Sequence, residues 1–137
     1  MDYTKPLLIE LPEFTDSRGS LSFIEANNHI PFQINRAYYL YDIPMGQKRG
    51  AHAHKELHQL IIAVSGSFEI TLHNGESSSS FCLSSPSQGL YVPPMIWRDL
   101  SNFSKHAVCM VFASEFFSEE DYIMDFSSYL QLTGELI

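Results

Sequence analysis

Residues 46–66 read Gly-Gln-Lys-Arg-Gly-Ala-His-Ala-His-Lys-Glu-Leu-His-Gln-Leu-Ile-Ile-Ala-Val-Ser-Gly, and the rest of the chain is organised around this stretch. His52 and His54 are two residues apart, so in an extended strand both imidazoles leave the same face. The apolar run 60–64 is rich in β-branched residues and is bounded by Ser-Gly-Ser, which predicts a buried strand that enters a tight turn. We therefore expect a histidine pair that is anchored on a rigid sheet.

Length, composition and charge limit the class of protein. The chain has 137 residues, of which 45% are apolar and 13% aromatic, so we expect one domain over residues 1–137 with a single core. The net charge of −8 argues against a general nucleic-acid binder and against a protein that binds anionic membranes, because both need a basic face. Lys48, Arg49 and Lys55 nevertheless flank the histidine pair, which suits an anionic ligand; the alternative is an ordinary solvated loop.

Neither a disulfide framework nor a targeting segment is visible in the sequence. Cys82 and Cys109 lie in apolar, strand-like runs and are predicted to be free thiols. No charged-then-apolar segment begins the chain, and no apolar run approaches the ~18 residues that span a bilayer. The expected compartment is the cytoplasm, without a membrane partner.

Short strand-like runs separated by turn residues recur along the chain. They are predicted at 7–9, 21–25, 34–41, 60–64, 68–72, 81–83, 89–92, 96–100 and 107–113. Runs 60–64 and 68–72 are expected to form a hairpin, Asn74-Gly75 is a second hairpin turn, and serines 77–80 are predicted to lie on an exposed strand or sheet edge. This pattern predicts an all-β fold, an antiparallel sandwich or jelly-roll barrel whose mouth is a natural ligand site.

Only the tail has helical spacing. Ser118 and Asp121 resemble a capping box, and apolar residues recur after them at intervals of a helical turn. We predict one short C-terminal helix over about residues 118–131.

Two motifs resemble those of the cupin superfamily. The pattern Gly46-x5-His52-x-His54-x4-Gln59-x6-Gly66 looks like the first cupin motif, and Gly89, Pro93, Trp97 and Asn102 resemble a degraded second one. Metal-binding cupins place a glutamate where this chain has Gln59 and a third histidine where it has Arg98. The two remaining histidines are one short of the three protein ligands usual at a catalytic metal, so neither a metal nor another cofactor is expected.

Four sequence blocks carry a narrower resemblance. They are residues 30–39, 49–59, 89–97 and 113–123, and together they make the chain similar, over about residues 7–130, to the dTDP-4-keto-6-deoxyhexose 3,4-ketoisomerase family of FdtA-like and WxcM-like sugar isomerases. The resemblance implies a metal-free cupin jelly roll that forms a homodimer with exchanged N-terminal strands. It implies a dTDP-linked 4-keto-6-deoxy sugar as substrate and a 3-keto product for deoxy-aminosugar and surface polysaccharide biosynthesis.

Histidine suits the chemistry that the family performs. Moving a ketone from carbon 4 to carbon 3 requires abstraction of the proton on carbon 3, an enediol, and protonation of carbon 4. An imidazole with an ordinary pKa of ~6.5 is largely neutral in the cytoplasm and can return the proton. The resemblance makes His52 the base and His54 its neighbour, which orients it or donates to the enediolate oxygen. Tyr38 and Tyr39 point to opposite faces of one strand, so only one faces the histidines; we take Tyr39 as catalytic and Tyr38 as substrate-binding.

The remaining candidates are cationic or aromatic. Arg49 suits the enediolate or the diphosphate, because a guanidinium fork binds such oxygens bidentately, and Arg18 is a second diphosphate candidate unless it is merely an exposed turn residue. Arg98 is expected at the substrate. Tyr91 and Trp97 are candidates to stack on thymine, with core packing as the alternative.

Three rival functions remain open at this stage. A nucleotide-sugar 3,5-epimerase has the same fold class, but it would need a histidine supported by a carboxylate and a tyrosine acid. A metal-dependent cupin oxygenase would need the ligands that are replaced here. A non-enzymatic sugar-binding cupin would bind the ligand without exchanging its hydrogens.

Overall fold

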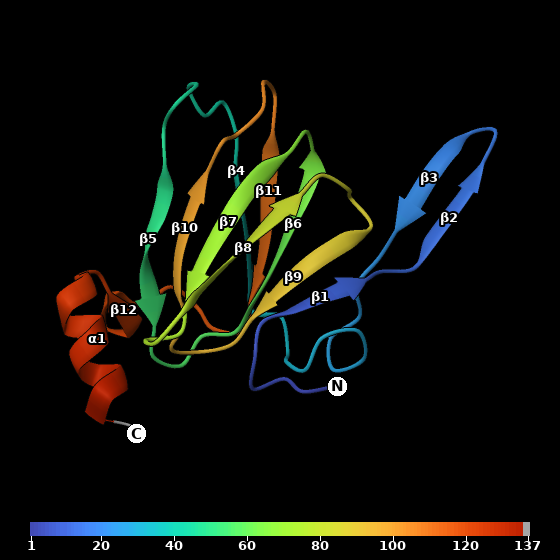
Figure 1. Cartoon of the computed structure of the whole chain (residues 1–137). Coiled ribbons are helices and arrows are strands. Elements are labelled where there is room, and N and C mark those ends of the chain that lie inside the picture. The colour runs from blue at the N-terminus through green and yellow to red at the C-terminus, as the bar shows by residue number, and fades with distance from the viewer. Residues whose placement is uncertain (136–137) are drawn as a thin grey trace.

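Two antiparallel sheets of five strands each form the body of the molecule in the computed structural model, which describes residues 1–135 (Figure 1). One sheet has the strand order β1-β9-β6-β11-β4 and the other the order β12-β5-β10-β7-β8. The all-β antiparallel architecture and the short C-terminal helix are therefore confirmed. The expected single domain extends to residue 137, and residues 136–137 lie outside the described part.

The strands and helices have the following bounds. The strands are β1 (Leu7–Glu10), β2 (Glu13–Asp16), β3 (Gly19–Ser22), β4 (Arg36–Leu40), β5 (Arg49–His54), β6 (Gln59–Ser65), β7 (Phe68–His73), β8 (Ser78–Leu83), β9 (Gln88–Val92), β10 (Trp97–Ser101), β11 (Val108–Ala113) and β12 (Tyr122–Ile123). The helices are the 3-10 turn η1 (Glu119–Asp121) and the α-helix α1 (Phe126–Glu135).

The main core lies between the two sheets and follows from the alternation of side chains along each strand. Ile61 of β6 faces Ile70 and Leu72 of β7 across this core, and all three are buried. Leu60 points to the opposite face of β6, where residues from the segment 24–34 cover it. Strand β6 is apolar on both faces because both faces are buried.

The Ser-Gly-Ser turn does not form the expected hairpin. Strand β6 pairs with β9 and β11, whereas β7 pairs with β8 and β10, so the chain crosses from one sheet to the other at this turn. Gly66 has a φ of 67°, and a Cβ there would lie 2.9 Å from the Cα of Ala107. The glycine is required by the corner between sheets, because only a residue without a side chain fits it. The Asn74-Gly75 hairpin and the exposed edge strand β8 are confirmed.

The C-terminal helix begins at Phe126 and not near residue 118. Ser118 makes no capping hydrogen bond with its side chain. The carboxylate of Asp125 instead accepts from the backbone N–H of Ser128 at 2.9 Å, which is the geometry of a helix N-cap. The segment expected to be helical before residue 126 contains η1 and β12, and β12 adds a short strand beside β5.

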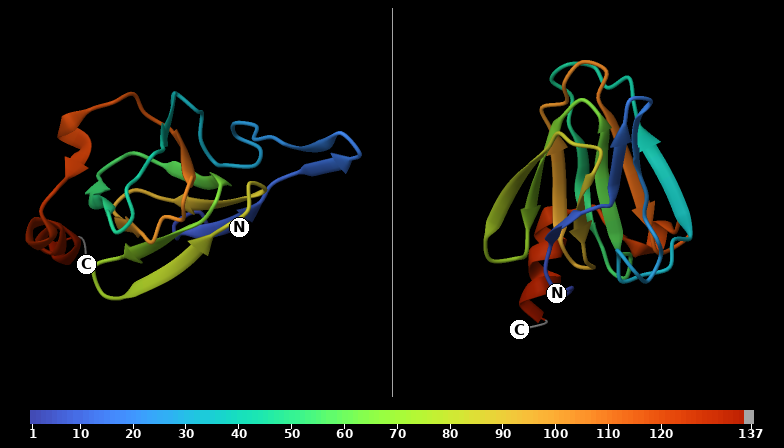
Figure 2. Two further views of the ribbon diagram at one scale, coloured as in Figure 1. Left: turned by 90° about the horizontal axis from the view of Figure 1, so that it is seen from above. Right: turned by 90° about the vertical axis from the view of Figure 1, so that its right-hand side faces the viewer.

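The hairpin of β2 and β3 projects from the sandwich, as the left-hand view of Figure 2 also shows. Every residue of its two strands is exposed. Strand β2 was not predicted, because an exposed strand has no buried face to impose an apolar alternation. Within residues 1–135, no helix is long and apolar enough to span a membrane.

Candidate active site

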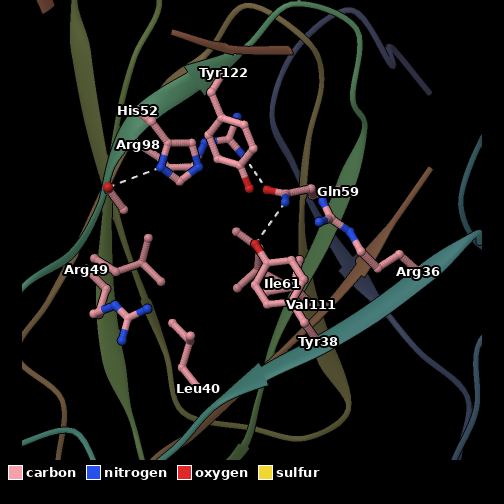
Figure 3. Close-up of a pocket in the computed structure, with 12 residues that line it drawn as sticks. Arg36, Tyr38, Leu40, Arg49, His52, Gln59, Ile61, Arg98, Val111 and Tyr122 are labelled. Atoms are coloured by element: carbon pink, nitrogen blue, oxygen red, sulfur yellow. Dashed lines mark hydrogen bonds between the residues drawn. The ribbon is translucent and has the colours of Figure 1, made fainter. Parts of the chain in front are cut away.

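A cavity of about 300 Å³ opens between the two sheets and collects polar side chains from five strands (Figure 3). Its lining consists of Arg36, Tyr38 and Leu40 of β4, Arg49, Gly50 and His52 of β5, Gln59 and Ile61 of β6, Arg98 and Leu100 of β10, Val111 of β11 and Tyr122 of β12. A cavity with apolar walls and a few convergent polar groups is the usual form of a small-molecule site.

The two histidines share one face of β5, as expected from their spacing. Their ring centroids are 4.8 Å apart and the rings are nearly perpendicular. The register between β5 and β10 shifts beside Gly50 and Ala51, which both have positive φ, so a β-bulge precedes His52. His52 lines the cavity, whereas His54 is fully buried and does not. His54 was expected to orient His52 or to donate to the enediolate oxygen. Because it does not line the cavity, His54 is not placed to contact an enediolate.

The environment of His52 makes it a neutral base. Its Nδ1 lies 3.1 Å from the carbonyl oxygen of Gly50, which can only accept, so Nδ1 carries the hydrogen and Nε2 keeps the lone pair. Nε2 is buried and has no hydrogen-bond partner among the described residues. Burial, followed by the nearby charge of Arg98, lowers the pKa of His52 to about 4.

Asp121 and Tyr122 also belong to the site, although neither was among the expected residues. Asp121 accepts hydrogen bonds from Nδ1 of His54 at 3.0 Å and from the backbone N–H of Glu56 at 2.8 Å. Tyr122 pairs with His54 across β12 and β5, and its ring centroid lies 4.4 Å from that of His54 and 5.0 Å from that of His52. Burial, followed by the charge of Arg98, lowers the pKa of His54 far below its ordinary value.

A chain of hydrogen bonds crosses the cavity from Arg98 to Tyr38. The fully buried Arg98 donates to the Oε1 of Gln59, and Gln59 donates through Nε2 to the Tyr38 hydroxyl at 3.0 Å. Arg98 also donates to the carbonyl oxygen of Ile96 at 2.9 Å. Burial lowers the pKa of Arg98 to about 10, so the guanidinium remains a cation at neutral pH.

Gln59 and Arg98 stand where metal-binding cupins have a glutamate and a third histidine. Both line the same cavity as His52. Among residues 1–135, no group of three or more histidine, cysteine or acidic side chains is placed to hold a metal ion.

Two more arginines line the cavity. Arg49 was expected there, and Arg36 was not. The guanidinium of Arg36 lies over the rings of Tyr38 and Phe117, at 5.3 and 5.7 Å from their centroids, and its Nε and Nη2 are buried without a described partner. Because Arg36 and Tyr38 are two residues apart on one strand, the spacing used for the histidines would have placed both side chains on one face.

Tyr39 does not face the cavity, which corrects the expectation that made it catalytic. Its side chain is on the outer face of β4, where its ring lies 5.7 Å from that of Tyr41, and it is 58% exposed. Tyr38 takes the inward position, because adjacent residues of a strand point to opposite faces.

Three expected substrate-binding residues also lie outside the cavity of this chain. The fully buried Tyr91 packs on the outer face of its sheet, and its hydroxyl lies 2.7 Å from Nδ1 of His58. Trp97 packs against Tyr129 of α1 on the outer side of β10. Arg18 is at the exposed tip of the β2–β3 hairpin, paired with Asp16. Tyr91 and Trp97 therefore pack in the core, which was the alternative to stacking on thymine.

The chain is similar to known proteins over nearly its whole length. Residues 4–134 match the family described as "FdtA: WxcM-like, C-terminal". The chain is 41% identical over 129 residues to the TDP-4-oxo-6-deoxy-alpha-D-glucose-3,4-oxoisomerase of Aneurinibacillus thermoaerophilus, which covers 94% of this chain and 93% of that protein.

Solved structures of ketoisomerases superpose closely on the chain. The 3,4-ketoisomerase QdtA from Thermoanaerobacterium thermosaccharolyticum in complex with TDP has a TM-score of 0.94 and 35% identity, and the match covers 97% of each chain. A 3,4-ketoisomerase from Helicobacter canadensis has a TM-score of 0.92 and 40% identity, with 94% of this chain and 97% of that chain covered. The chain belongs to the FdtA/WxcM-like family of dTDP-sugar 3,4-ketoisomerases, whose fold is cupin-like.

Proposed function

We propose that this protein converts dTDP-4-keto-6-deoxyglucose to a dTDP-3-keto-6-deoxyhexose without a metal ion or other cofactor. The observation that carries the proposal is the cavity in which the lone-pair nitrogen of His52 meets the buried positive charge of Arg98. Two comparisons support it. The 41% identical relative is named for this type of reaction, and a mutant of QdtA has been solved in complex with TDP-4-keto-6-deoxyglucose.

His52 is the proposed base. Its Nε2 takes the proton from carbon 3, and the electrons of the broken bond form a double bond between carbons 3 and 4. Negative charge develops on the oxygen at carbon 4, where preorganised positive groups in a water-poor site stabilise it most. Arg98 and the Gln59–Tyr38 pair are proposed to supply this stabilisation. His52 then returns the proton to carbon 4, the hydrogen of oxygen 3 passes to oxygen 4, and the electrons of the broken oxygen–hydrogen bond form the ketone at carbon 3.

Arg36 and Arg49 are the proposed ligands of the diphosphate. Both line the cavity, and guanidinium groups bind phosphate oxygens bidentately. They also compensate for the net charge of −8, which would otherwise repel a sugar nucleotide. His54 is proposed to act through its neighbours His52 and Tyr122, because it does not line the cavity.

A homodimer with exchanged N-terminal strands is the proposed assembly. The β2–β3 hairpin exposes Phe14 and Leu21, which are 63% and 59% accessible in the single chain. In such a dimer, Arg18 at the hairpin tip would contribute to the site of the partner, which is the proposed role for this residue. The 3-keto product suits a subsequent 3-aminotransferase, in deoxy-aminosugar and surface polysaccharide synthesis, and the cytoplasm is the proposed compartment.

The experiment mixes chelator-treated protein with dTDP-4-keto-6-deoxyglucose in heavy water and follows the sugar by NMR. We expect a 3-keto product with deuterium at carbon 4, and loss of the reaction in His52→Asn. A wild type that neither moves the ketone nor exchanges any hydrogen of the sugar would instead support a sugar-binding protein.

A 3,5-epimerase is the second candidate, because His54 has a carboxylate partner in Asp121 and Tyr122 adjoins both histidines. The supported histidine is, however, the one that does not line the cavity, and His52 is held by a backbone carbonyl. Deuterium at carbons 3 and 5, with the ketone still at carbon 4, would favour the epimerase.

A further inference from the structure

Arg36 is held at the cavity by aromatic rings and not by carboxylates. Its guanidinium carbon lies 5.3 Å from the ring centroid of Tyr38 and 5.7 Å from that of Phe117. Within residues 1–135, Arg36 forms no ion pair with an acidic side chain, although the chain carries a net charge of −8. An aromatic face attracts a cation without neutralising it. The positive charge of Arg36 therefore remains available to an anionic ligand.

Two nitrogens of this guanidinium lack hydrogen-bond partners. Nε and Nη2 of Arg36 are both buried, and neither has a partner in the described part of the chain. They form one edge of the guanidinium, and their parallel N–H groups can bind two oxygens of one phosphate. Buried donors that the protein leaves unsatisfied cost free energy, which an anionic ligand recovers by accepting from them.

The position of Phe117 is not explained by packing in the core. Phe117 is 62% exposed, so most of its surface stays in water and contributes little to core stability. Its ring contacts instead two residues that line the cavity. The ring lies near the guanidinium of Arg36, and its centroid is 5.9 Å from that of Tyr122.

We propose that Phe117 is a positioning residue, whose ring holds the Arg36 guanidinium for bidentate binding of a phosphate group of the sugar nucleotide. The inference rests on the proposed function, in which Arg36 is a ligand of the diphosphate. It assigns a role in substrate binding to an exposed residue that acts through its neighbour.

The fold brings the segment of Phe117 next to Arg36 directly. Arg36 pairs with Ala113 at the end of β11, and the chain leaves the sheet there. The backbone N–H of Asn35 donates to the carbonyl oxygen of Ala113 at 2.9 Å, and Nδ2 of Asn35 donates to that of Ser114 at 2.7 Å. These bonds fix the backbone between β11 and Phe117 against the residue that precedes Arg36. The contact between ring and guanidinium is therefore built into the strand pairing.

The test measures TDP binding by calorimetry, and steady-state kinetics with the keto sugar nucleotide, in Phe117→Leu. Leucine keeps apolar bulk at this exposed position but has no aromatic face. We expect the dissociation constant of TDP and KM to rise about 3–30-fold, as for the loss of a cation–π contact. Because the diphosphate is held equally in the ground state and the transition state, kcat should change little. Phe117→Tyr, which keeps the ring, should match the wild type.

Phe116→Leu is the matched control, because Phe116 is the neighbouring residue and is 74% exposed. It should bind TDP as the wild type does. An unchanged dissociation constant in Phe117→Leu, or equal rises in the two leucine variants, would overturn the inference.

A double-mutant cycle tests whether Phe117 acts through Arg36. In an Arg36→Gln background, Phe117→Leu should weaken TDP binding by less than about twofold, because the guanidinium that the ring holds is gone. The same loss in both backgrounds would show that the ring acts independently of Arg36, and would overturn the inference. Because TDP binding does not require the reaction, a wild type that binds TDP but does not move the ketone would contradict the ketoisomerase proposal alone.

Discussion

The carboxylate of Asp121 lies 3.0 Å from Nδ1 of His54, although 67 positions separate the two residues in the sequence. Since an ionised carboxylate only accepts hydrogen bonds, this contact places the hydrogen of His54 on Nδ1 and the lone pair on Nε2. We expect ¹⁵N NMR of the histidine rings at neutral pH to show this tautomer for both His52 and His54. A signal for the opposite tautomer at His54 would contradict the assignment.

Replacement of Asp121 by asparagine should impair stability and activity together. The change removes the charge from two hydrogen bonds in a side chain that is only 13% exposed, and bonds to charged groups contribute about 1.5–3 kcal/mol each. We expect a lower midpoint of chemical denaturation, and kcat reduced about 10–100-fold, as when the partner that orients a functional histidine is lost. Glu120→Gln, at the exposed neighbouring position, is the control and should leave both unchanged.

The activity should persist at a lower pH than an ordinary histidine base allows. The pKa of His52 is lowered to about 4 from 6.5, so Nε2 keeps its lone pair well below neutral pH. We expect kcat/KM for the wild type to be level from about pH 5 upward, roughly one unit above that pKa. An acid limb centred near 6.5 would show that burial and Arg98 do not lower this pKa.

The same shift should make the free energy of unfolding depend on pH. The folded-state pKa of His52 lies below the unfolded-state value, so the unfolded chain binds more protons between about pH 4 and 6.5. The contribution of His52 to stability is therefore fully present above pH 6.5 and is lost as the pH falls through about 4. Denaturant titrations should show this loss in the wild type, and a smaller one in His52→Asn.

Local patterns in the sequence predicted most of the fold. The alternation in β7 and the Asn74-Gly75 turn gave the correct strand and hairpin, because both depend on neighbours in the chain. The corner at Gly66 was misinterpreted, since a Ser-Gly-Ser turn has the same sequence signature whether the next strand pairs with the previous one or joins the other sheet. That choice depends on partners far along the chain, such as β9 and β10.

The candidate site was likewise predicted where local spacing decides the geometry, and missed where contacts between distant residues decide it. The spacing of two residues correctly placed His52 and His54 on one face, and the same rule allowed Tyr38 or Tyr39 but could not choose between them. The choice depends on which face of β4 meets the core. Asp121 was interpreted as part of a helix cap, because a carboxylate three residues after a serine fits a cap in any sequence. Its actual partner, His54, is distant in the chain.

Gly66→Ala should destabilise the protein without touching the cavity. The substitution would hold an alanine at a φ of 67° and bring its Cβ within 2.9 Å of the Cα of Ala107. A strained left-handed residue costs about 1–3 kcal/mol before any steric contact is counted. Gly134→Ala is the matched control, because nothing lies within 4 Å of its Cβ position in α1. Equal midpoints of urea denaturation in the two variants would contradict the role of the corner.

The exposed hairpin should control assembly. Phe14 of β2 stacks with Phe23, the residue after β3, with their centroids 6.2 Å apart, and Phe14 pairs with Leu21 of β3. The hairpin therefore presents apolar surface that a second copy would bury. We expect the wild type to sediment as a dimer, and the double variant Phe14→Glu, Leu21→Glu to sediment as a monomer at the same concentration. The variant should also lose activity, because Arg18 would no longer reach the partner's cavity. Leu130→Glu, on the surface of α1, should remain dimeric, and a monomeric wild type would exclude the exchanged-strand assembly.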